Sequence, residues 1–388
     1  MKRDYVDFYL KVSAKNLGIS EKFVEFIGKG DAYLKFFLPF ERRRGEFVKI
    51  DWEAFFASKI KGPYFGEIYL KEDFHEVPLI AFLNVFSNSL FDFPFGGMCI
   101  KIGISEDNYS LWERKIIFKN IFEIIFESDY FKNSLFVKGE GINEESMMIL
   151  YDEISRKSLN SYTQLLGKPP SIYGFSQIDN IFCDALIFGI ETMLEDYGEK
   201  IKDKRVTFYG FDRYSNLLIE KLYQEGVKNF IIDMEEERYL SVEDKIRSKF
   251  IRILKEEMIN YESDIFIISG SVESLKKEKA DFLNSRYVIE MKFFGVEPHA
   301  EEVLAKRNIA LLPDIFIKGI LNSIYFEEHL KGKENIKDEE ILLKVKKKLV
   351  EVYRDILGIG IAKNLSIKKS SYMIALGRIM KLIGMKGI

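Results

Sequence analysis

The chain has 388 residues, of which 47% are hydrophobic and 31% charged, a balance typical of a soluble globular protein with room for two domains. Its formal net charge of −3 provides no basic field, so the composition carries no specific signal for nucleic acid. The two cysteines and three histidines are too few and too scattered to form a disulfide framework or a metal site, and no apolar run reaches membrane-spanning length. Because the first residues also lack a signal-peptide pattern, we expect a cytoplasmic protein. Lys, Glu and Ile are abundant and glutamine is rare, a bias seen in proteins of thermophiles and of AT-rich genomes alike.

The first part of the chain shows short strands between amphipathic helices. The pattern predicts helices over 4–27 with a break at Gly18–Ser20, strands over 32–39, 45–50 and 65–70, a helix over 76–91, a strand over 98–104, a helix over 110–129, a strand over 135–138 and a helix over 144–166. Ser20 is placed to cap the second helix. The segment Gly167–Pro170 then breaks the pattern, so we place a first domain at residues 1–170.

From residue 176 onward, strands alternate regularly with helices. We predict strands over 205–209, 229–233, 264–269, 287–290 and 309–312, separated by helices over 179–197, 216–226, 242–260, 276–283 and 300–307. Strands separated by helices of this length imply a parallel sheet. We therefore place a second, Rossmann-like domain at residues 176–330, and closing helices over 338–357 and 369–382 in a final segment, residues 331–388.

The turn after strand 205–209 bears on dinucleotide binding. A Gly-x-Gly-x-x-Gly turn brings the backbone close to a diphosphate, but the three glycine positions here are Gly210, Asp212 and Ser215. Asp212 places a side chain and a negative charge where the diphosphate would lie. Asp233, about twenty residues further on, could hold a ribose hydroxyl, although aspartate is common at strand ends. We expect no bound cofactor, with NAD or NADP as the alternative.

Five sets of segments, spread over roughly residues 5–385, share their order and spacing with one enzyme family. They are Gly62–Tyr64; Glu76-Val77 with Asp92–Gly97; Asp152–Ser155 with Gly167–Pro169; Gly210-Phe211; and Val288–Glu290 with Pro298 and Pro313-Asp314. Together they resemble the hexameric glutamate dehydrogenases of the Glu/Leu/Phe/Val dehydrogenase family. The resemblance implies a two-domain α/β fold: an N-terminal mixed-sheet domain that also makes subunit contacts, a Rossmann-like domain, and C-terminal helices that pack back on the first domain.

The family's reaction is an oxidative deamination that uses a nicotinamide, with lysines and an aspartate that handle charge and protons. The resemblance places its two substrate-binding lysines on Phe65 and Ser87, its catalytic lysine on Cys99 and its catalytic aspartate on Gly139. A substrate carboxylate in a buried cleft needs a cationic partner, which Phe65 and Ser87 cannot supply. We therefore expect the family's reaction to be absent.

Positions near the expected nucleotide site are altered as well. The resemblance places a threonine and a glycine of the family on Cys183 and Asp184, and an asparagine near Phe293. Cys99 and Cys183 could act as nucleophiles or form a disulfide, but lone cysteines are more often apolar filler. Phenylalanines near the expected cleft, among them Phe65, either fill a core or line an apolar surface.

Two neighbouring residues are candidate substitutes for the missing catalytic groups. Lys101 lies two residues past Cys99, and Glu140 directly follows Gly139, so a small loop shift could bring them together. In the alternative interpretation Lys101 lies on the outward face of a strand and Glu140 in solvent.

Two functions remain open at this stage. The first is a catalytically inactive, glutamate-dehydrogenase-like protein with a structural, regulatory or interaction role, which self-associates or co-assembles with an active paralogue. The second is an NAD(P)-dependent oxidoreductase that acts on the CH–NH2 group of an amino acid through a remodelled site. An unrelated binding module has no specific feature in its favour.

Overall fold

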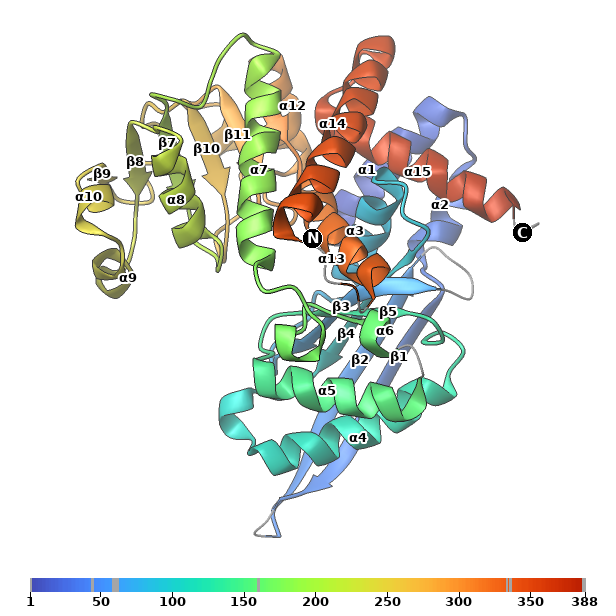
Figure 1. Ribbon diagram of the computed structural model, residues 1–388. Helices are drawn as coiled ribbons and strands as arrows, with labels where there is room; N and C mark the ends of the chain where they lie inside the picture. The colour runs from blue at the N-terminus through green and yellow to red at the C-terminus, as the bar shows by residue number, and fades with distance from the viewer. Residues whose placement is uncertain are drawn as a thin grey trace. The chain divides into compact units, whose positions relative to one another are not determined.

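The computed structural model of the protein describes residues 2–42, 45–57, 63–158, 161–332, 334 and 337–385. The chain divides into two compact units, each assembled from three segments (Figure 1). We call them the mixed-sheet unit (residues 14–178, 322–341 and 374–388) and the parallel-sheet unit (residues 1–13, 179–321 and 342–373). Among the described helices, none is both long enough and apolar enough to cross a membrane.

The mixed-sheet unit is built on six strands in the order β1-β2-β4-β3-β5-β6. β1 pairs antiparallel with β2, and β2 with β4, whereas the remaining neighbours are parallel. The strands are β1 (Ala32–Glu41), β2 (Phe47–Ala57), β3 (Tyr64–Leu70), β4 (Gly96–Ile102), β5 (Leu135–Lys138) and β6 (Leu165–Leu166). Every residue of β3 and β4 is buried, as expected for parallel strands covered on both faces.

Helices cover both faces of this sheet. On one face, α4 and α5 pack their isoleucines and phenylalanines on the side chains of Ile68, Met98 and Ile100. On the other face, α3 comes so close to β4 that a Cβ atom at Gly97 would overlap the carbonyl oxygen of Ala81. The helices that begin in this part of the chain are α2 (Glu21–Gly28), α3 (Val77–Leu90), α4 (Leu111–Glu127), α5 (Glu144–Lys157) and α6 (Ser161–Gln164), with short 3-10 turns at Glu106–Asn108 and Pro170–Ile172.

The parallel-sheet unit has six strands in the order β12-β11-β10-β7-β8-β9, all paired in parallel. This is the doubly wound order of dinucleotide-binding folds, with the switch point between β7 and β10. In Figure 1, α7 and α8 lie in front of this sheet and α12 lies behind it. The strands are β7 (Arg205–Tyr209), β8 (Asn229–Ile232), β9 (Phe250–Arg252), β10 (Ile265–Ile268), β11 (Tyr287–Glu290) and β12 (Ala310–Leu312).

The remaining helices begin in the parallel-sheet unit or contribute residues to both units. They are α1 (Lys2–Leu17), α7 (Ile178–Glu195), α8 (Ser215–Gln224), α9 (Glu236–Ser241), α10 (Asp244–Arg247), α11 (Lys277–Ala280), α12 (Pro298–Lys306), α13 (Asp314–Lys331), α14 (Asp338–Lys363) and α15 (Ile367–Met385). The two-domain α/β fold class is confirmed, including the mixed and the parallel sheet. The C-terminal part of α15 belongs to the mixed-sheet unit, where Arg378 donates to the carbonyl of Ser89 at 3.3 Å.

Most predicted elements are present, but several stretches differ. The helix predicted over 144–166 is wrong at its end, because α5 ends at Lys157 and residues 165–166 form β6, which pairs with β5. The strand predicted over 45–50 extends to Ala57 as β2, and α9 lies at 236–241, where no element was predicted. The helix predicted over 242–260 is wrong, because that stretch holds α10, β9 and turns, and β9 adds an edge strand beside β8. No element was predicted over 314–331, where α13 lies. Ser20 does cap α2, since its side chain accepts from the N–H of Phe23.

Candidate functional site

The positions expected to bind a substrate lie in the apolar interior between β3, β4 and α3. Phe65 on β3 is 1% exposed, and Ser87 on α3 and Cys99 on β4 are fully buried. Phe65 packs against Phe95, with ring centroids 6.1 Å apart. Burial raises the pKa of the Cys99 thiol well above its usual range, which disfavours the reactive thiolate. These three side chains therefore provide neither a cation nor an activated nucleophile.

Between these positions the helix and the sheet are joined by an amide–carboxylate contact. Asn84 of α3 donates to the Glu67 carboxylate at 2.6 Å and to the carbonyl of Met98 at 3.0 Å. Both side chains are buried. The polar groups of this interior thus serve the packing of α3 on the sheet. Gly62 of the first resembling segment lies outside the described residues.

Gly139 is a position where no side chain fits. A Cβ atom there would overlap the backbone carbonyl oxygen of Ile68, to which the N–H of Gly139 donates at 3.0 Å. The close approach of the two backbones, continuing the β3–β5 ladder, explains the glycine. An aspartate could enter this position only if the strand ends moved apart.

The two candidate substitutes pair with other residues. Lys101 is 2% exposed and contacts Asp51 at 2.8 Å, so it is not on an outward, solvated face. Glu140 is exposed and contacts Lys71 at 3.0 Å. Each charge is therefore neutralised by its own neighbour, and the structure does not bring the two together as a lysine–carboxylate pair.

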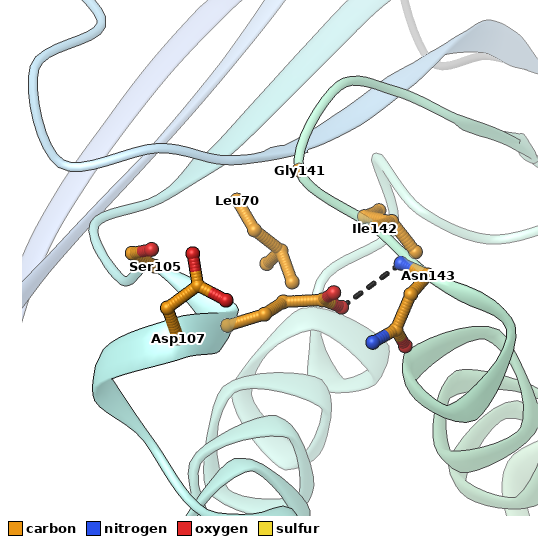
Figure 2. Close-up of a pocket in the computed structure, with 7 residues that line it drawn as sticks. Leu70, Ser105, Asp107, Gly141, Ile142 and Asn143 are labelled. Atoms are coloured by element: carbon orange, nitrogen blue, oxygen red, sulfur yellow. Dashed lines mark hydrogen bonds between the residues drawn. The ribbon is translucent and has the colours of Figure 1, made fainter.

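A pocket of about 320 Å³ lies at the carboxyl ends of β3, β4 and β5 (Figure 2). The side chain of Glu106, which lines the pocket, is fixed by two contacts. Its carboxylate accepts from the N–H of Asn143 at 2.9 Å and pairs with Arg114 at 3.3 Å. The lining residues are Leu70, Ser105, Glu106, Asp107, Gly141, Ile142 and Asn143. The described lining contains two carboxylates and no lysine or arginine, so it does not suit the carboxylate of an amino acid. None of the predicted catalytic residues lines it.

In the parallel-sheet unit, the β7–α8 turn is closed by its own side chains. Gly210 has φ +87°, which only glycine adopts readily, as predicted for the first position of the turn. The Asp212 carboxylate accepts from the N–H of Tyr214 and from the Ser215 hydroxyl, both at 2.9 Å, and the N–H of Asp212 donates to that hydroxyl at 2.9 Å. Burial raises the pKa of Asp212, while the bonds from Ser215 and Tyr214 oppose this rise. A protein carboxylate thus occupies the start of α8, where a helix N-terminus would bind phosphate.

The switch point between β7 and β10 is also filled. Ser269 at the end of β10 donates to the carbonyl of Gly210 at 2.7 Å. A Cβ atom at Gly270 would overlap the carbonyl oxygen of Phe211, and one at Gly210 would overlap the carbonyl oxygen of Ser269. The two loops that would flank a dinucleotide therefore lie in direct backbone contact.

The other positions predicted to bind a nucleotide are Cys183, Asp184 and Asp233. Cys183 and Asp184 contact neighbouring parts of the protein. Cys183 is buried beside the carbonyl of Tyr214, and its pKa is raised by burial. Both cysteines are free thiols. Asp184 pairs with Lys221 of α8 at 2.6 Å. Asp233 is exposed just beyond the end of β8. Within the described ranges, no group of three His, Cys, Asp or Glu side chains could hold a metal ion.

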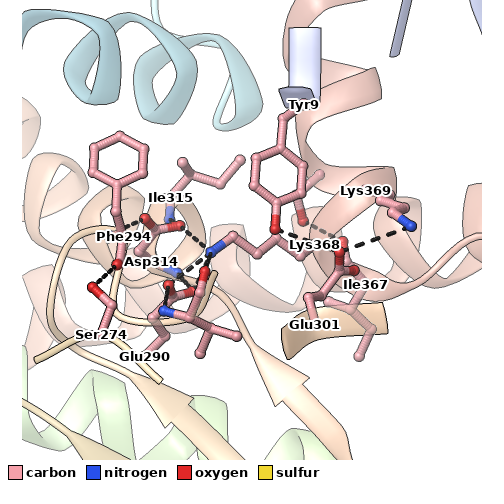
Figure 3. Close-up of polar contacts among 12 residues, drawn as sticks. Tyr9, Ser274, Glu290, Phe294, Glu301, Asp314, Ile315, Ile367, Lys368 and Lys369 are labelled. Atoms are coloured by element: carbon pink, nitrogen blue, oxygen red, sulfur yellow. Dashed lines mark hydrogen bonds and ion pairs between the residues drawn. The ribbon is translucent and has the colours of Figure 1, made fainter. Parts of the chain in front are cut away.

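A cluster of buried charges that the sequence analysis did not identify joins α15 to the parallel sheet (Figure 3). Lys368 donates to both oxygens of Glu290 at 2.7 Å and lies 3.7 Å from Asp314, and all three side chains are fully buried. Glu290 also accepts from the N–H groups of Val296 and Asp314. Burial and the nearby Asp314 raise the pKa of Glu290 to about 8, although Lys368 opposes this. Glu290 and Asp314 had appeared only as marks of family resemblance.

A second buried lysine lies on α13, in the stretch without a predicted element. Lys318 is 3% exposed, and its ammonium lies 5.7 Å from the ring centroid of Phe293. Burial lowers its pKa to about 7. In the sequence, the only feature that could have indicated a buried lysine here is its place within the otherwise apolar run from Ile315 to Ile320.

Comparison with known proteins agrees with this architecture. The sequence profile of the Glutamate/Leucine/Phenylalanine/Valine dehydrogenase family matches residues 227–387. A hetero-hexameric glutamate dehydrogenase from Thermus thermophilus, solved in a Leu-bound form, superposes with a TM-score of 0.84 at 17% identity over 99% of this chain and 97% of that one. Glutamate dehydrogenase from Peptoniphilus asaccharolyticus gives 0.81 at 16% identity over 100% and 99%. Glutamate dehydrogenase 2 from Plasmodium falciparum gives 0.80 at 16% identity over 100% and 92%.

The structural similarities extend over the whole chain and show a common fold. The profile match covers the strands and helices from β8 to α15, including Glu290, Asp314 and Lys368 of the buried cluster. Residues 227–387 therefore match the Glu/Leu/Phe/Val dehydrogenase family in sequence, and the whole chain shares the fold of the glutamate dehydrogenases.

Proposed function

We propose that this chain is a catalytically inactive, glutamate-dehydrogenase-like protein that serves as a structural or regulatory subunit, assembling with itself or with an active paralogue. One observation carries the proposal: the Asp212 carboxylate bonds to Tyr214 and Ser215 at the start of α8. A diphosphate entering there would meet a like charge and would have to displace these bonds. A dehydrogenase of this fold without a bound nicotinamide has no hydride acceptor.

The substrate positions support the same conclusion independently. Phe65, Ser87 and Cys99 are buried and uncharged, and Gly139 has no room for a carboxylate. Retention of a large, well-packed fold without this chemistry is consistent with a role in assembly. The hetero-hexameric dehydrogenase of Thermus thermophilus provides a precedent, within the same fold, for assemblies of unlike chains.

The deciding experiment is calorimetric titration of the purified chain with NAD(H) and NADP(H). We expect no saturable binding at millimolar cofactor. Saturable binding in the micromolar range would contradict the proposal. Asp212→Gly removes the carboxylate that occupies the turn, and Asp212→Asn is the matched control that keeps its shape. A gain of dinucleotide binding in D212G but not in D212N would show that this residue blocks the site.

Lys318 favours a second candidate function, an NAD(P)-dependent oxidoreductase with a remodelled site. A lysine with a pKa near 7 is partly neutral at physiological pH and suited to general-base chemistry. This candidate requires turnover of an amino acid with NAD or NADP, and loss of that turnover in Lys318→Met. The absence of any turnover across a panel of amino acids would exclude this candidate, and the catalytically inactive protein would remain as the proposed function.

A further inference from the structure

α3 carries three polar side chains in a largely apolar interior. Asn84, Ser87 and Asn88 are fully buried, and their three- and four-residue spacing places them on neighbouring turns of one side of the helix. Asn322 of α13, which belongs to the same mixed-sheet unit, is also fully buried and donates to the Asn88 side-chain oxygen at 2.9 Å. We call these four residues the α3 polar cluster.

The orientation of two amides in the cluster is fixed by their neighbours. The Asn84 nitrogen donates to the Glu67 carboxylate at 2.6 Å and to the carbonyl of Met98 at 3.0 Å. The Asn322 nitrogen donates to Asn88. Turning either amide over would place its oxygen against another acceptor, so the Oδ1 atoms of Asn84 and Asn322 are the groups that still need a partner.

Three polar atoms of the cluster have no hydrogen-bond partner within the described ranges. They are Asn84 Oδ1, Asn322 Oδ1 and the hydroxyl of Ser87. A buried polar atom without a partner is costly and rare in folded proteins. The single hydroxyl proton of Ser87 cannot serve both amide oxygens, so these groups require a molecule that supplies two donors and accepts one bond.

We propose that the α3 polar cluster binds one buried water molecule. The water donates to Asn84 Oδ1 and Asn322 Oδ1 and accepts from the hydroxyl of Ser87. Buried waters typically make about three hydrogen bonds to polar groups that the protein otherwise leaves unpaired. An anion would be repelled by the two carbonyl oxygens, and an apolar molecule would leave all three groups unpaired.

The water links α3 to α13 at a position that bears on the chemistry of the fold. Ser87 is the residue on which the family resemblance places a substrate-binding lysine, and the water keeps a hydrogen-bonding group there without a positive charge. The site is independent of the proposed function, because the α3 polar cluster is part of the packed mixed-sheet unit whether or not the chain binds a nicotinamide.

A crystal structure of the full chain, at a resolution that shows ordered waters, tests the site directly. We expect one density peak at hydrogen-bond distance, about 2.7–2.9 Å, from all three atoms. A cluster without that peak would overturn the proposal. So would a Ser87 hydroxyl that donates instead to the carbonyl of Leu83, one turn back along α3.

Thermal unfolding of Ser87→Ala, Asn322→Ala and the double variant tests the water in solution. Either single change removes the water, so S87A should melt below wild type and S87A/N322A should melt at the temperature of N322A. Ser146→Ala is the matched control, because Ser146 is fully buried on α5, across the sheet, and its hydroxyl accepts directly from Arg114 at 2.7 Å. Its loss should add to that of N322A. Additive losses for S87A and N322A, or an S87A variant that melts above wild type, would overturn the proposal.

Discussion

Replacing Lys368 by methionine tests whether the buried charge cluster stabilises the parallel-sheet unit. In K368M, Glu290 and Asp314 keep their backbone N–H partners but lose the ammonium that contacts Glu290 at 2.7 Å. Because both carboxylates are fully buried, loss of their cation should cost about 3–5 kcal/mol. At roughly 2–4 °C per kcal/mol for a unit of this size, we expect the melting temperature to fall by about 6–20 °C.

The assay is thermal and urea unfolding followed by circular dichroism, with two comparison variants. Lys369→Met removes the adjacent lysine of α15, which is partly exposed and contacts Glu302 at 3.4 Å and Glu301 at 4.0 Å, so its effect should be smaller than that of K368M. The double variant K368M/E290Q removes one buried negative charge together with the cation and should recover part of the lost stability.

The pH dependence of the same variant supplies a further check. The deficit of K368M should shrink as pH falls through about 8, because protonation then neutralises Glu290, whose pKa burial and the nearby Asp314 raise to about 8. A K368M variant within about 1 kcal/mol of wild type at pH 9, where Glu290 is ionised, would refute the reasoning. It would mean that Lys368 compensates no buried negative charge in the native protein.

Three further predictions follow from buried groups. Lys318 has a folded-state pKa of about 7, below its unfolded value, so burial of its charge lowers the free energy of unfolding most below pH 7. This destabilisation disappears as pH rises toward the unfolded pKa. The stability gained by Lys318→Met should therefore shrink between pH 7 and pH 10 in urea titrations. Gly139→Asp should lower the melting temperature and restore no deamination, because its Cβ would overlap the carbonyl of Ile68; a stable G139D variant would contradict this packing. Cys99 and Cys183 should resist a thiol reagent in the native protein and react only on unfolding, since burial raises both pKa values; rapid labelling at pH 8 would show that these sites are open.

The regular alternation of strands and helices made most of the parallel sheet predictable. The segment 205–209 has β-forming residues and ends at Gly210, whose positive φ requires glycine, so both strand and turn follow from local chemistry. Local patterns failed at β9, because three residues form a strand there only by pairing with β8. They gave no signal for α13, whose apolar residues have no clear amphipathic period.

The sequence by itself determined the fold class, the family resemblance and the absence of the expected side chains at Phe65, Ser87, Cys99 and Gly139. Only the tertiary structure decided what replaced them. In the tertiary structure Lys368 contacts Glu290, 78 residues away in the chain, and the Asp212 carboxylate accepts from Ser215 at the start of α8. Lys101 and Glu140 each pair with a different residue. The physical reason is that a residue type limits which chemistry is available, whereas charge pairing and burial depend on neighbours that are distant in the chain.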